Sequence, residues 1–284
     1  MKAFTKRNIL LYFRDKTAVF FSLLAVIIVI LLYSLFLGDL TAKEMPDVAA
    51  ADHLLSTWII AGILAITSMT TTLGAFGILV EDQANRTILD FYASPISRTK
   101  LVMGYILSAC LIGVTMCILI LIGANVYLLL NGHGLLPWKN ILTIIGIILL
   151  SVLASCSIVL WVVSYLKTAN AFAAASMLIG TLIGFLAGVY IPIGNLPNYL
   201  QTIVILFPVS HGAALFRQVI MEPSIMSTFA QAPQGYEDAF LLTLGVKYEL
   251  NGYAISNTWS VLYLIVVAIV FFGWALLRLR RKLS

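Results

Sequence analysis

The stretch "EDQANRTILDFYASPISRTK", from Glu81 to Lys100, interrupts a chain that is almost free of charge on either side of it. It gathers charged residues, one proline and several Ser and Thr residues between two long apolar runs. A loop that only joins two membrane spans needs just a few polar residues. A patterned block of this length therefore predicts a structure of its own, and the function we expect depends on it.

The composition places the chain in a membrane. Of its 284 residues, 61% are hydrophobic and 10% are charged, whereas water-soluble domains carry about 25% charged residues. The first apolar run is too long for a signal peptide and lacks a small-residue cleavage site, so we expect it to remain as a span. The predicted fold class is an all-α integral membrane protein.

Six apolar runs have the roughly 20 residues that a transmembrane helix needs. They are Thr17–Gly38, Leu55–Val80, Leu101–Leu130, Ile141–Leu166, Ala169–Pro192 and Thr258–Leu277. We treat residues 1–284 as a single transmembrane domain. An even number of spans places both termini on one side of the membrane.

The distribution of basic residues predicts which side that is. With both termini in the cytosol, most of the 17 basic residues fall in the inner segments, as the positive-inside rule requires. These inner residues are Lys2, Lys6, Arg7, Arg14, Lys16, Arg86, Arg98, Lys100, Lys167, Arg278, Arg280, Arg281 and Lys282. The outer segments keep only Lys43, Lys139, Arg217 and Lys247.

The long outer segment 193–257 contains two apolar pieces separated by Pro208. Neither piece is long enough to cross a membrane, so we predict a pair of re-entrant or interfacial helices before the last span. The remainder, Met221–Ser256, is more polar and predicts a small external cap.

The N-terminal piece "KAFTKRNILLYFRDK", from Lys2 to Lys16, mixes cations with apolar and aromatic residues. This pattern is typical of a helix that lies along the inner membrane surface. The alternative is a basic tail that only sets the topology. For an interfacial helix, we expect contributions from Phe4, Arg7, Leu11 and Arg14.

Neither cysteines nor histidines predict a metal site. The cysteines Cys110, Cys117 and Cys156 lie inside apolar runs, where thiols pack as small apolar groups, and we expect no disulfide. The three histidines are far apart in the sequence and predicted to be external, so we interpret them as isolated polar loop residues. They are His53, His133 and His211.

No Asp, Glu, Lys or Arg lies well inside a predicted span, although an ion-coupled carrier needs titratable groups at that depth. The polar residues Thr67, Thr70, Thr71 and Asn125 are candidates for a substrate path, with hydrogen bonds within or between helices as the alternative. Gly180, Gly184 and Gly188 recur at four-residue spacing, which predicts a face for close helix packing.

The chain contains no phosphate-binding Gly-rich loop and no hydrolase motif. We therefore expect no catalytic residue and no cofactor on the chain itself. If the protein moves a substrate uphill, the energy has to come from a partner.

The block from Glu81 to Lys100 predicts a short amphipathic helix on the cytosolic side. Asn85 is a candidate N-cap and Ser97 can cap the next helix, while Pro95 excludes Ser94 from the helical region. One face is apolar through residues at three- and four-residue spacing: Ile88, Leu89, Tyr92 and Ile96. The alternative is an ordinary polar loop on the lipid headgroups.

The block also resembles the central signature of type-2 ABC export permeases, an acidic pair followed by Gly-Thr, Leu-rich residues and Ser-Pro-x-Ser-Arg. The matching residues are Glu81, Asp82, Thr87, Leu89, Ser94, Pro95, Ser97 and Arg98. The sequence departs from the signature at Arg86, where that family usually has Gly.

Two further places resemble the same family. Arg14–Lys16 is similar to the Arg-Asp-Pro that precedes its first span, with Lys16 in place of Pro. Gly188–Arg217 resembles the end of its fifth span, with the expected order Pro192, Leu196, Pro197, Pro208 and Arg217. The resemblance covers nearly the whole chain.

The resemblance implies a half-transporter in a bacterial plasma membrane, exporting an amphipathic drug, lipid or antibiotic peptide. A second permease chain, identical or related, would face it. A cytosolic ATP-binding subunit would hold ATP and Mg and dock on the short helix. Implied contacts are Ile88, Leu89 and Tyr92 for apolar docking and Glu81, Asp82 and Arg98 for charge. Two other functions remain open: an ion-coupled carrier, and a membrane sensor or scaffold that transports nothing.

Overall fold

The structure, a computed structural model, describes residues 1–32, 51–166, 168–229, 236–250 and 253–283. It shows an all-α membrane protein with one small β-hairpin. The elements in chain order are α1 (Lys2–Arg14), α2 (Lys16–Leu32), α4 (Ala51–Ala84), α5 (Thr87–Ala93), α6 (Arg98–Leu130), α7 (Trp138–Tyr165), α8 (Ala169–Leu186), the 3₁₀ helix η2 (Ile193–Asn195), α9 (Asn198–Leu206), α10 (Pro208–Ile220), α11 (Glu222–Thr228), α12 (Tyr236–Thr243), β1 (Tyr248–Leu250), β2 (Tyr253–Ile255) and α13 (Asn257–Leu283).

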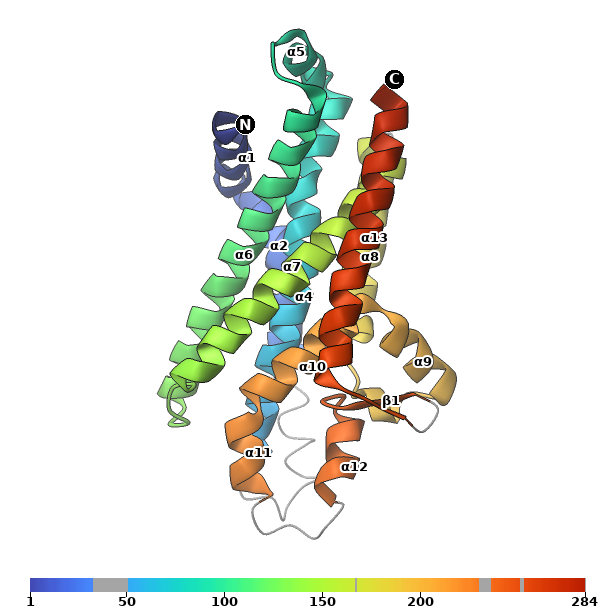
Figure 1. The fold of residues 1–284 in the computed structure, drawn as a ribbon. Helices are drawn as coiled ribbons and strands as arrows, with labels where there is room; N and C mark the ends of the chain where they lie inside the picture. Colours follow the sequence, from blue (N-terminus) through green and yellow to red (C-terminus); the bar gives the residue numbers. More distant parts are fainter. Residues whose placement is uncertain (33–50, 167, 230–235, 251–252, 284) are drawn as a thin grey trace.

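Within the described ranges, five helices are long and apolar enough to cross a membrane: α4, α6, α7, α8 and α13. The expected first span, Thr17–Gly38, is described only as far as Leu32, as α2, and its remaining residues lie outside the described ranges. Both termini and α5 lie at one end of the bundle, called here the α5 end (Figure 1). The helices α11 and α12 and the hairpin lie at the opposite end, called the α12 end.

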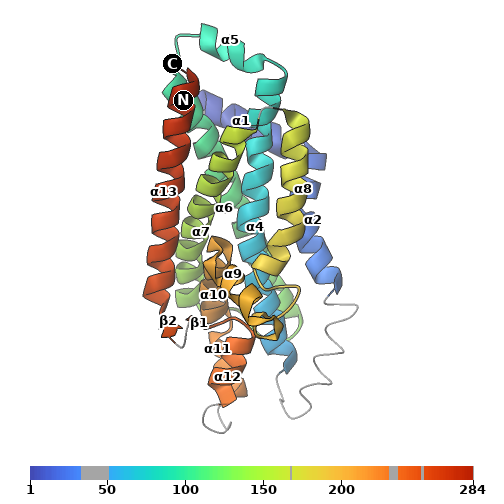
Figure 2. The same ribbon diagram turned by 90° about the vertical axis from the view of Figure 1, so that its right-hand side faces the viewer.

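Helix α4 forms the centre of the bundle. It packs against α2, α6, α7, α8 and α10, while α13 covers α7 from the outside (Figure 2). Every residue from Leu54 to Leu73 is buried. A helix that is apolar around its whole circumference has to be surrounded by other helices in this way. The surrounded part of α4 ends before its last turn, where the polar block begins at Glu81.

The two helices predicted on either side of Pro208 are present as α9 and α10, which meet at an angle of 88°. A re-entrant pair and a broken span both have this geometry, so the re-entrant assignment stays a prediction. Pro208 occupies the first turn of α10, where its missing N–H costs no helical hydrogen bond. Phe207 before it is extended, with ψ 126°, because a proline disfavours the helical region for the preceding residue. The break was therefore correctly predicted at Pro208.

Helix α8 ends at Leu186, six residues before the predicted end at Pro192. The reason is a glycine C-terminal motif. Gly188 has φ +61°, and the N–H groups of Gly188 and Val189 donate to the carbonyls of Phe185 and Gly184. This Schellman pattern closes a helix on a left-handed glycine.

Within the described part of the chain, no helix packs along the predicted small-residue stripe on α8, and packing against a second chain stays a prediction. A Cβ added at Gly180 would meet no atom within 4 Å. At Gly184 it would collide with the ring of Tyr190, which folds back onto the helix. Gly188 serves the C-terminal turn, so the three glycines have three different surroundings.

Arg217 on α10 is fully buried, although the sequence placed it in an external segment. Its Nη2 donates to the carbonyls of Ala187 (2.9 Å) and Gly188 (2.8 Å), and its Nη1 donates to Gly245 (3.3 Å). These carbonyls end α8 and α12, and the C-terminal end of a helix carries partial negative charge. The guanidinium also lies 5.0 Å from the ring centroid of Trp58. Arg217 thus holds the α12 end of the bundle together.

The histidines are not isolated loop residues. The rings of His53 and His133 stack at 4.3 Å between centroids. His211 is buried on α10, with Nδ1 3.0 Å from the hydroxyl of Ser260 on α13. The sequence missed these contacts because the pairs are distant in the chain. Among the described residues, no group of three or more metal-binding side chains occurs.

The hairpin pairs Tyr248 with Ile255 and Leu250 with Tyr253. Tyr248 is buried, and its hydroxyl donates to the carbonyl of Ser210 on α10 (3.0 Å). The segment that we predicted as an external cap is therefore packed onto α10.

Two thiols allow a test of how α6 is aligned along α7. The Sγ atoms of Cys110 and Cys156 lie 3.2 Å apart, while Cys117 is buried elsewhere on α6. Oxidation of the folded protein with diamide should convert this pair to a disulfide, with diamide taking up the two hydrogens. Alkylation after denaturation should then modify only Cys117.

The Cys117→Ser variant should still form the cross-link, and Cys156→Ser should not. If all three cysteines of the oxidised protein remained open to alkylation, the α6–α7 register would be wrong.

Candidate functional site

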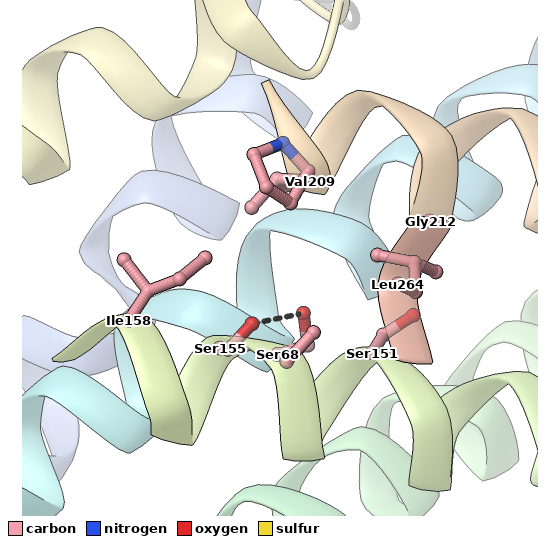
Figure 3. A pocket seen from close by; sticks show the side chains of 9 residues that line it. Ser68, Ser151, Ser155, Ile158, Val209, Gly212 and Leu264 are labelled. Atoms are coloured by element: carbon pink, nitrogen blue, oxygen red, sulfur yellow. Dashed lines mark hydrogen bonds between the residues drawn. The ribbon is translucent and has the colours of Figure 1, made fainter. Parts of the chain in front are cut away.

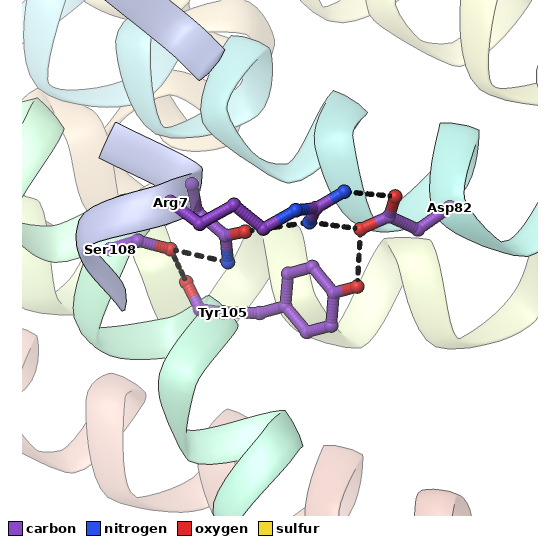
Figure 4. A network of polar contacts seen from close by, with 5 residues as sticks. Arg7, Asp82, Tyr105 and Ser108 are labelled. Atoms are coloured by element: carbon purple, nitrogen blue, oxygen red, sulfur yellow. Dashed lines mark hydrogen bonds and ion pairs between the residues drawn. The ribbon is translucent and has the colours of Figure 1, made fainter. Parts of the chain in front are cut away.

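An ion pair with a buried carboxylate and a half-buried guanidinium joins the N-terminal helix to the end of α4 (Figure 4). The Nη1 of Arg7 lies 2.7 Å from Oδ2 of Asp82, and its Nη2 lies 2.8 Å from Oδ1. The hydroxyl of Tyr105 on α6 donates to the same Oδ2 at 2.6 Å. The geometry is bidentate, which is the strong form of an arginine–carboxylate pair. We call these three residues the clamp.

The clamp exists because Asp82 is only 6% exposed. A carboxylate in such a place is strongly destabilising unless donors surround it, and here a guanidinium and a phenol do so. The hydrogen bonds that Arg7 donates to Asp82 raise the pKa of Arg7, so the guanidinium keeps its charge.

Polar contacts extend the clamp along α1 and α6. Asn8 accepts from Arg7 Nη1 (3.0 Å) and donates to the hydroxyl of Ser108 (3.3 Å). Ser108 in turn donates to the carbonyl of Tyr105 (2.8 Å). The clamp therefore fixes three helices, α1, α4 and α6, with one connected network.

Aromatic rings connect this network to α5. Phe4 is buried and meets Phe91 of α5 and Tyr105 of α6 edge to face, at 5.0 and 4.9 Å between centroids. The guanidinium of Arg7 lies 5.1 Å from the centroid of Phe91. A Cβ at Gly104 would stand 2.6 Å from the ring of Phe4, so this glycine provides the room for the ring. The short helix α5 is thus packed directly against the clamp.

The joint between α4 and α5 differs from the sequence prediction. Asn85 is not an N-cap; it directly follows α4, and its N–H donates to the carbonyl of Glu81 in the last turn of that helix (2.8 Å). The residue that precedes α5 is Arg86, with φ +60° and ψ 5°. It is the only non-glycine with positive φ among the described residues. This left-handed conformation is the one that glycine adopts without cost.

The end of α5 follows the prediction. Ser94 is extended before Pro95, with ψ 160°, and its hydroxyl donates to the carbonyl of Phe91 (2.6 Å). Ser97 is the N-cap residue of α6, but its hydroxyl makes no capping hydrogen bond. The proline, more than the serine, therefore separates the two helices.

The two faces of α5 are used differently. Ile88 and Phe91 of α5 are half-buried and pack against the core of the bundle, as does Ile96 in the link that follows α5. Leu89 is 55% exposed and points away from it. Within this chain Ile88 packs against the bundle, and its predicted contact with a partner stays a prediction. Thr87 is half-buried, and the side chains of Tyr92 and Arg98 lie outside what the structure describes.

The residues predicted for the interfacial helix and for the acidic pair are brought together. Asp82 is occupied by Arg7 and is not available to a partner, whereas Glu81 is exposed. Helix α1 buries Phe4, Thr5, Asn8 and Tyr12 on one face. Leu11 and Arg14 are exposed on the other side. Tyr105 was missed, although a phenol about one turn into a span is a usable signal for a hydrogen bond at that depth.

Three of the four candidate substrate-path residues form hydrogen bonds within the chain. The hydroxyls of Thr67 and Thr71 donate to the carbonyls of Ile63 and Thr67 in their own helix, both at 2.7 Å. Thr70 is buried without a hydrogen-bond partner. Asn125 donates to Leu121 (2.9 Å) and accepts from the N–H of Leu136 (3.2 Å), which fixes the turn after α6. The helix-packing interpretation fits these contacts better.

Beside this cluster, Ser68 and Ser155 share a hydrogen bond of 3.3 Å at the wall of a small cavity (Figure 3). Ser151, Gly212 and Leu264 also line it. Its volume of about 10 Å³ is close to the minimum for a single water molecule. It is too small for a substrate.

One comparison with known proteins is informative. The model of the ABC-2 type transporter family matches residues 1–221. The match includes the clamp and α5, and it ends where α11 begins. No curated protein matches the chain.

The clamp should contribute measurably to stability. Arg7→Ala leaves Asp82 buried with one donor, and we expect a loss of about 2–3 kcal/mol in the free energy of unfolding in detergent. This is below the 3–5 kcal/mol typical of a fully buried pair, because the side chain of Arg7 is 31% exposed. A double-mutant cycle with Asp82→Ala should show a coupling above about 1 kcal/mol.

The pair between Lys247 and Asp238 is a matched control, with the same 2.7 Å separation but 50% and 69% exposed side chains. Asp238→Ala should cost less than about 1 kcal/mol. A coupling near zero between Arg7 and Asp82 would contradict the clamp.

The left-handed conformation of Arg86, between α4 and α5, leads to a second prediction. A non-glycine in this conformation costs about 1–2 kcal/mol, so Arg86→Gly should leave the thermal midpoint unchanged or raise it. Arg86→Val should lower it, since β-branched residues fit this region poorly.

Asp90→Gly is the control, because glycine inside α5 should destabilise by about 1 kcal/mol. The opposite order, with Arg86→Gly the least stable of the three variants, would exclude a left-handed Arg86.

Proposed function

The chain belongs to the ABC-2 type transporter family, and we propose that it is the permease subunit of an exporter driven by ATP that a separate subunit hydrolyses. Within this proposal α5 is the coupling helix. The observation that carries it is the position of α5: it lies across the end of α4 and α6, exposes Leu89, and is packed against the clamp.

The arrangement supports transmission of force from α5 into the bundle. A push on α5 reaches α4 through Arg86, α6 through the short link 94–97, and α1 through the contact of Phe91 with Phe4. Because the clamp ties the same three helices together, they move as one unit. Rigid elements that repack as units are the usual carriers of such transitions.

We propose that the α5 end faces the cytosol of a bacterial cell. It carries both termini, and the exposed Lys2, Lys6, Arg14, Arg86 and Lys100 belong to the α5 end. The positive-inside rule favours this orientation. The ATP-binding subunit would then approach Leu89 and Glu81, and ATP and Mg would bind on that subunit. A second permease chain would complete the transporter, with an amphipathic drug, lipid or antibiotic peptide as the exported substrate.

An ion-coupled carrier is the second candidate. The buried charges of this structure do not favour it, because Asp82 is held by Arg7 and Arg217 is held by carbonyl groups. A proton relay needs a group that can exchange partners. Transport that persists without ATP and collapses with the proton gradient would favour the carrier. A sensor or scaffold would bind ATP through its partner and move no substrate in vesicles.

The exposed leucine of α5 provides the test. Leu89→Asp should reduce binding of the ATP-binding subunit and ATP-driven export at least tenfold, because it places a charge in an apolar docking contact. Complex formation is measured by co-purification with the ATPase, and export is measured in vesicles.

Met226→Asp is the matched control, since Met226 is also exposed and apolar but lies on α11 at the opposite end. It should leave the complex intact. If Leu89→Asp bound the ATPase and exported as well as the unchanged protein, α5 would not be the coupling helix.

A further inference from the structure

Two free cysteines of neighbouring spans meet inside the apolar part of the bundle. The Sγ atom of Cys110 on α6 lies 3.2 Å from the Sγ atom of Cys156 on α7. Cys110 follows Arg98, the first residue of α6, by twelve residues, which is about 18 Å of helix. The pair therefore lies at membrane depth, in the half of α6 next to the α5 end.

A second contact, one turn away, supports the alignment of these two helices. A Cβ added at Gly113 would stand 3.0 Å from Cγ1 of Val152, so the backbone of α6 comes close to α7 at this point. Gly113 follows Cys110 by three residues and Val152 precedes Cys156 by four, so each pair of positions shares one face of its helix. The two thiols are thus held where antiparallel helices touch.

The two thiols differ in exposure. Cys156 is fully buried, whereas Cys110 is half-buried. Cys110 stands at the edge of a stripe of exposed apolar side chains on α6, which Met103, Leu107 and Leu111 form. A lipid-soluble reagent can therefore reach Cys110 without opening the bundle. An accessible thiol with a second thiol beside it is the usual arrangement of redox-sensitive cysteine pairs.

We propose that Cys110 and Cys156 form an oxidation-sensitive modification site, at which a lipid-soluble hydroperoxide links α6 to α7. The hydroperoxide first transfers one oxygen atom to the sulfur of Cys110, which gives a sulfenic acid and an alcohol. The sulfur of Cys156 then bonds to that of Cys110, and the sulfenic hydroxyl leaves as water with the thiol hydrogen of Cys156.

This route is balanced and suits the surroundings of the pair. Two thiols and one hydroperoxide give one disulfide, one alcohol and one water, with two electrons passing from sulfur to the peroxide oxygens. Reactants and products are uncharged, so the apolar surroundings do not oppose the conversion. The two Sγ atoms have to approach from 3.2 Å to about 2.05 Å.

The disulfide would join two parts of the chain. The clamp ties α6 to α1 and α4, whereas α7 is covered by α13. A covalent bond between α6 and α7 prevents the part that α5 contacts from shifting along α7. We therefore expect the oxidised protein to be locked. The effect on export rests on the proposed function, whereas formation of the disulfide does not.

The test treats the full chain, alone and with its ATPase in vesicles, with cumene hydroperoxide. Alkylation after denaturation and mass spectrometry should show a disulfide between Cys110 and Cys156, and dithiothreitol should reverse it. The thermal midpoint should rise, because a cross-link restricts the unfolded chain. Export should fall with the linked fraction, so linking nine-tenths of the molecules lowers it about tenfold while the ATPase stays bound.

Variants of the cysteines serve as matched controls. Cys110→Ser and Cys156→Ser should keep their export after the same treatment, whereas Cys117→Ser should still be linked and inhibited. Cys156→Ser combined with Ser155→Cys keeps three thiols, but the moved thiol faces α4, because Ser155 lies 3.3 Å from Ser68. This double variant should not be linked. If it does not fold, the single variants carry the comparison.

Two results overturn the proposal: treated protein in which Cys110 is oxidised or unchanged without a link to Cys156, and linked protein that exports as fast as reduced protein. Reduced protein that exports nothing with ATP and its ATPase contradicts the proposed function instead. In that case the link and the thermal midpoint, measured on the chain alone, still decide the modification site.

Discussion

The carboxylate of Asp82 imposes the constraint on which the α5 end depends. It sits where the enclosed part of α4 meets the polar block, and it is almost fully buried. Such a group has to be neutralised locally, and the partners that reach it come from two other helices. Helix α1 is therefore not free to drift along the membrane surface. Its position, and through Phe4 the position of α5, follow from the need to pair one carboxylate.

At the α12 end the buried charge has the opposite sign and is paired with groups of a different kind. There the buried charge is the cation of Arg217, and its acceptors are backbone carbonyls at the ends of α8 and α12. Both helices end on a glycine with positive φ, Gly188 and Gly245, which turns the chain and leaves those carbonyls available. One arginine thus satisfies acceptors that the helix ends would otherwise bury unpaired. The bundle is fixed at each end by a charge with specific partners.

Local patterns in the sequence predicted much of this fold. Apolar length identified the five spans that the described residues contain, and the two prolines, Pro95 and Pro208, marked real breaks because a proline acts on its immediate neighbours. Long-range pairing was out of reach: Arg7 and Asp82 are 75 positions apart. The orientation of α5 was also missed, since its apolar face could equally have served a partner or the bundle. The end of α8 was misplaced because the apolar run continues to Pro192, past the left-handed turn at Gly188 that ends the helix.

The left-handed arginine between α4 and α5 has a mechanical consequence. A glycine at a joint can occupy several backbone regions, so part of any movement of the attached helix is absorbed by backbone rotation at the glycine. Arginine is confined to one small well when φ is positive. With Arg86 in that well, and if α5 is the coupling helix as we propose, we expect a displacement at its exposed side to be passed on to α4 and to Arg7. We therefore expect the joint at Arg86 to be stiffer than the same joint with a glycine.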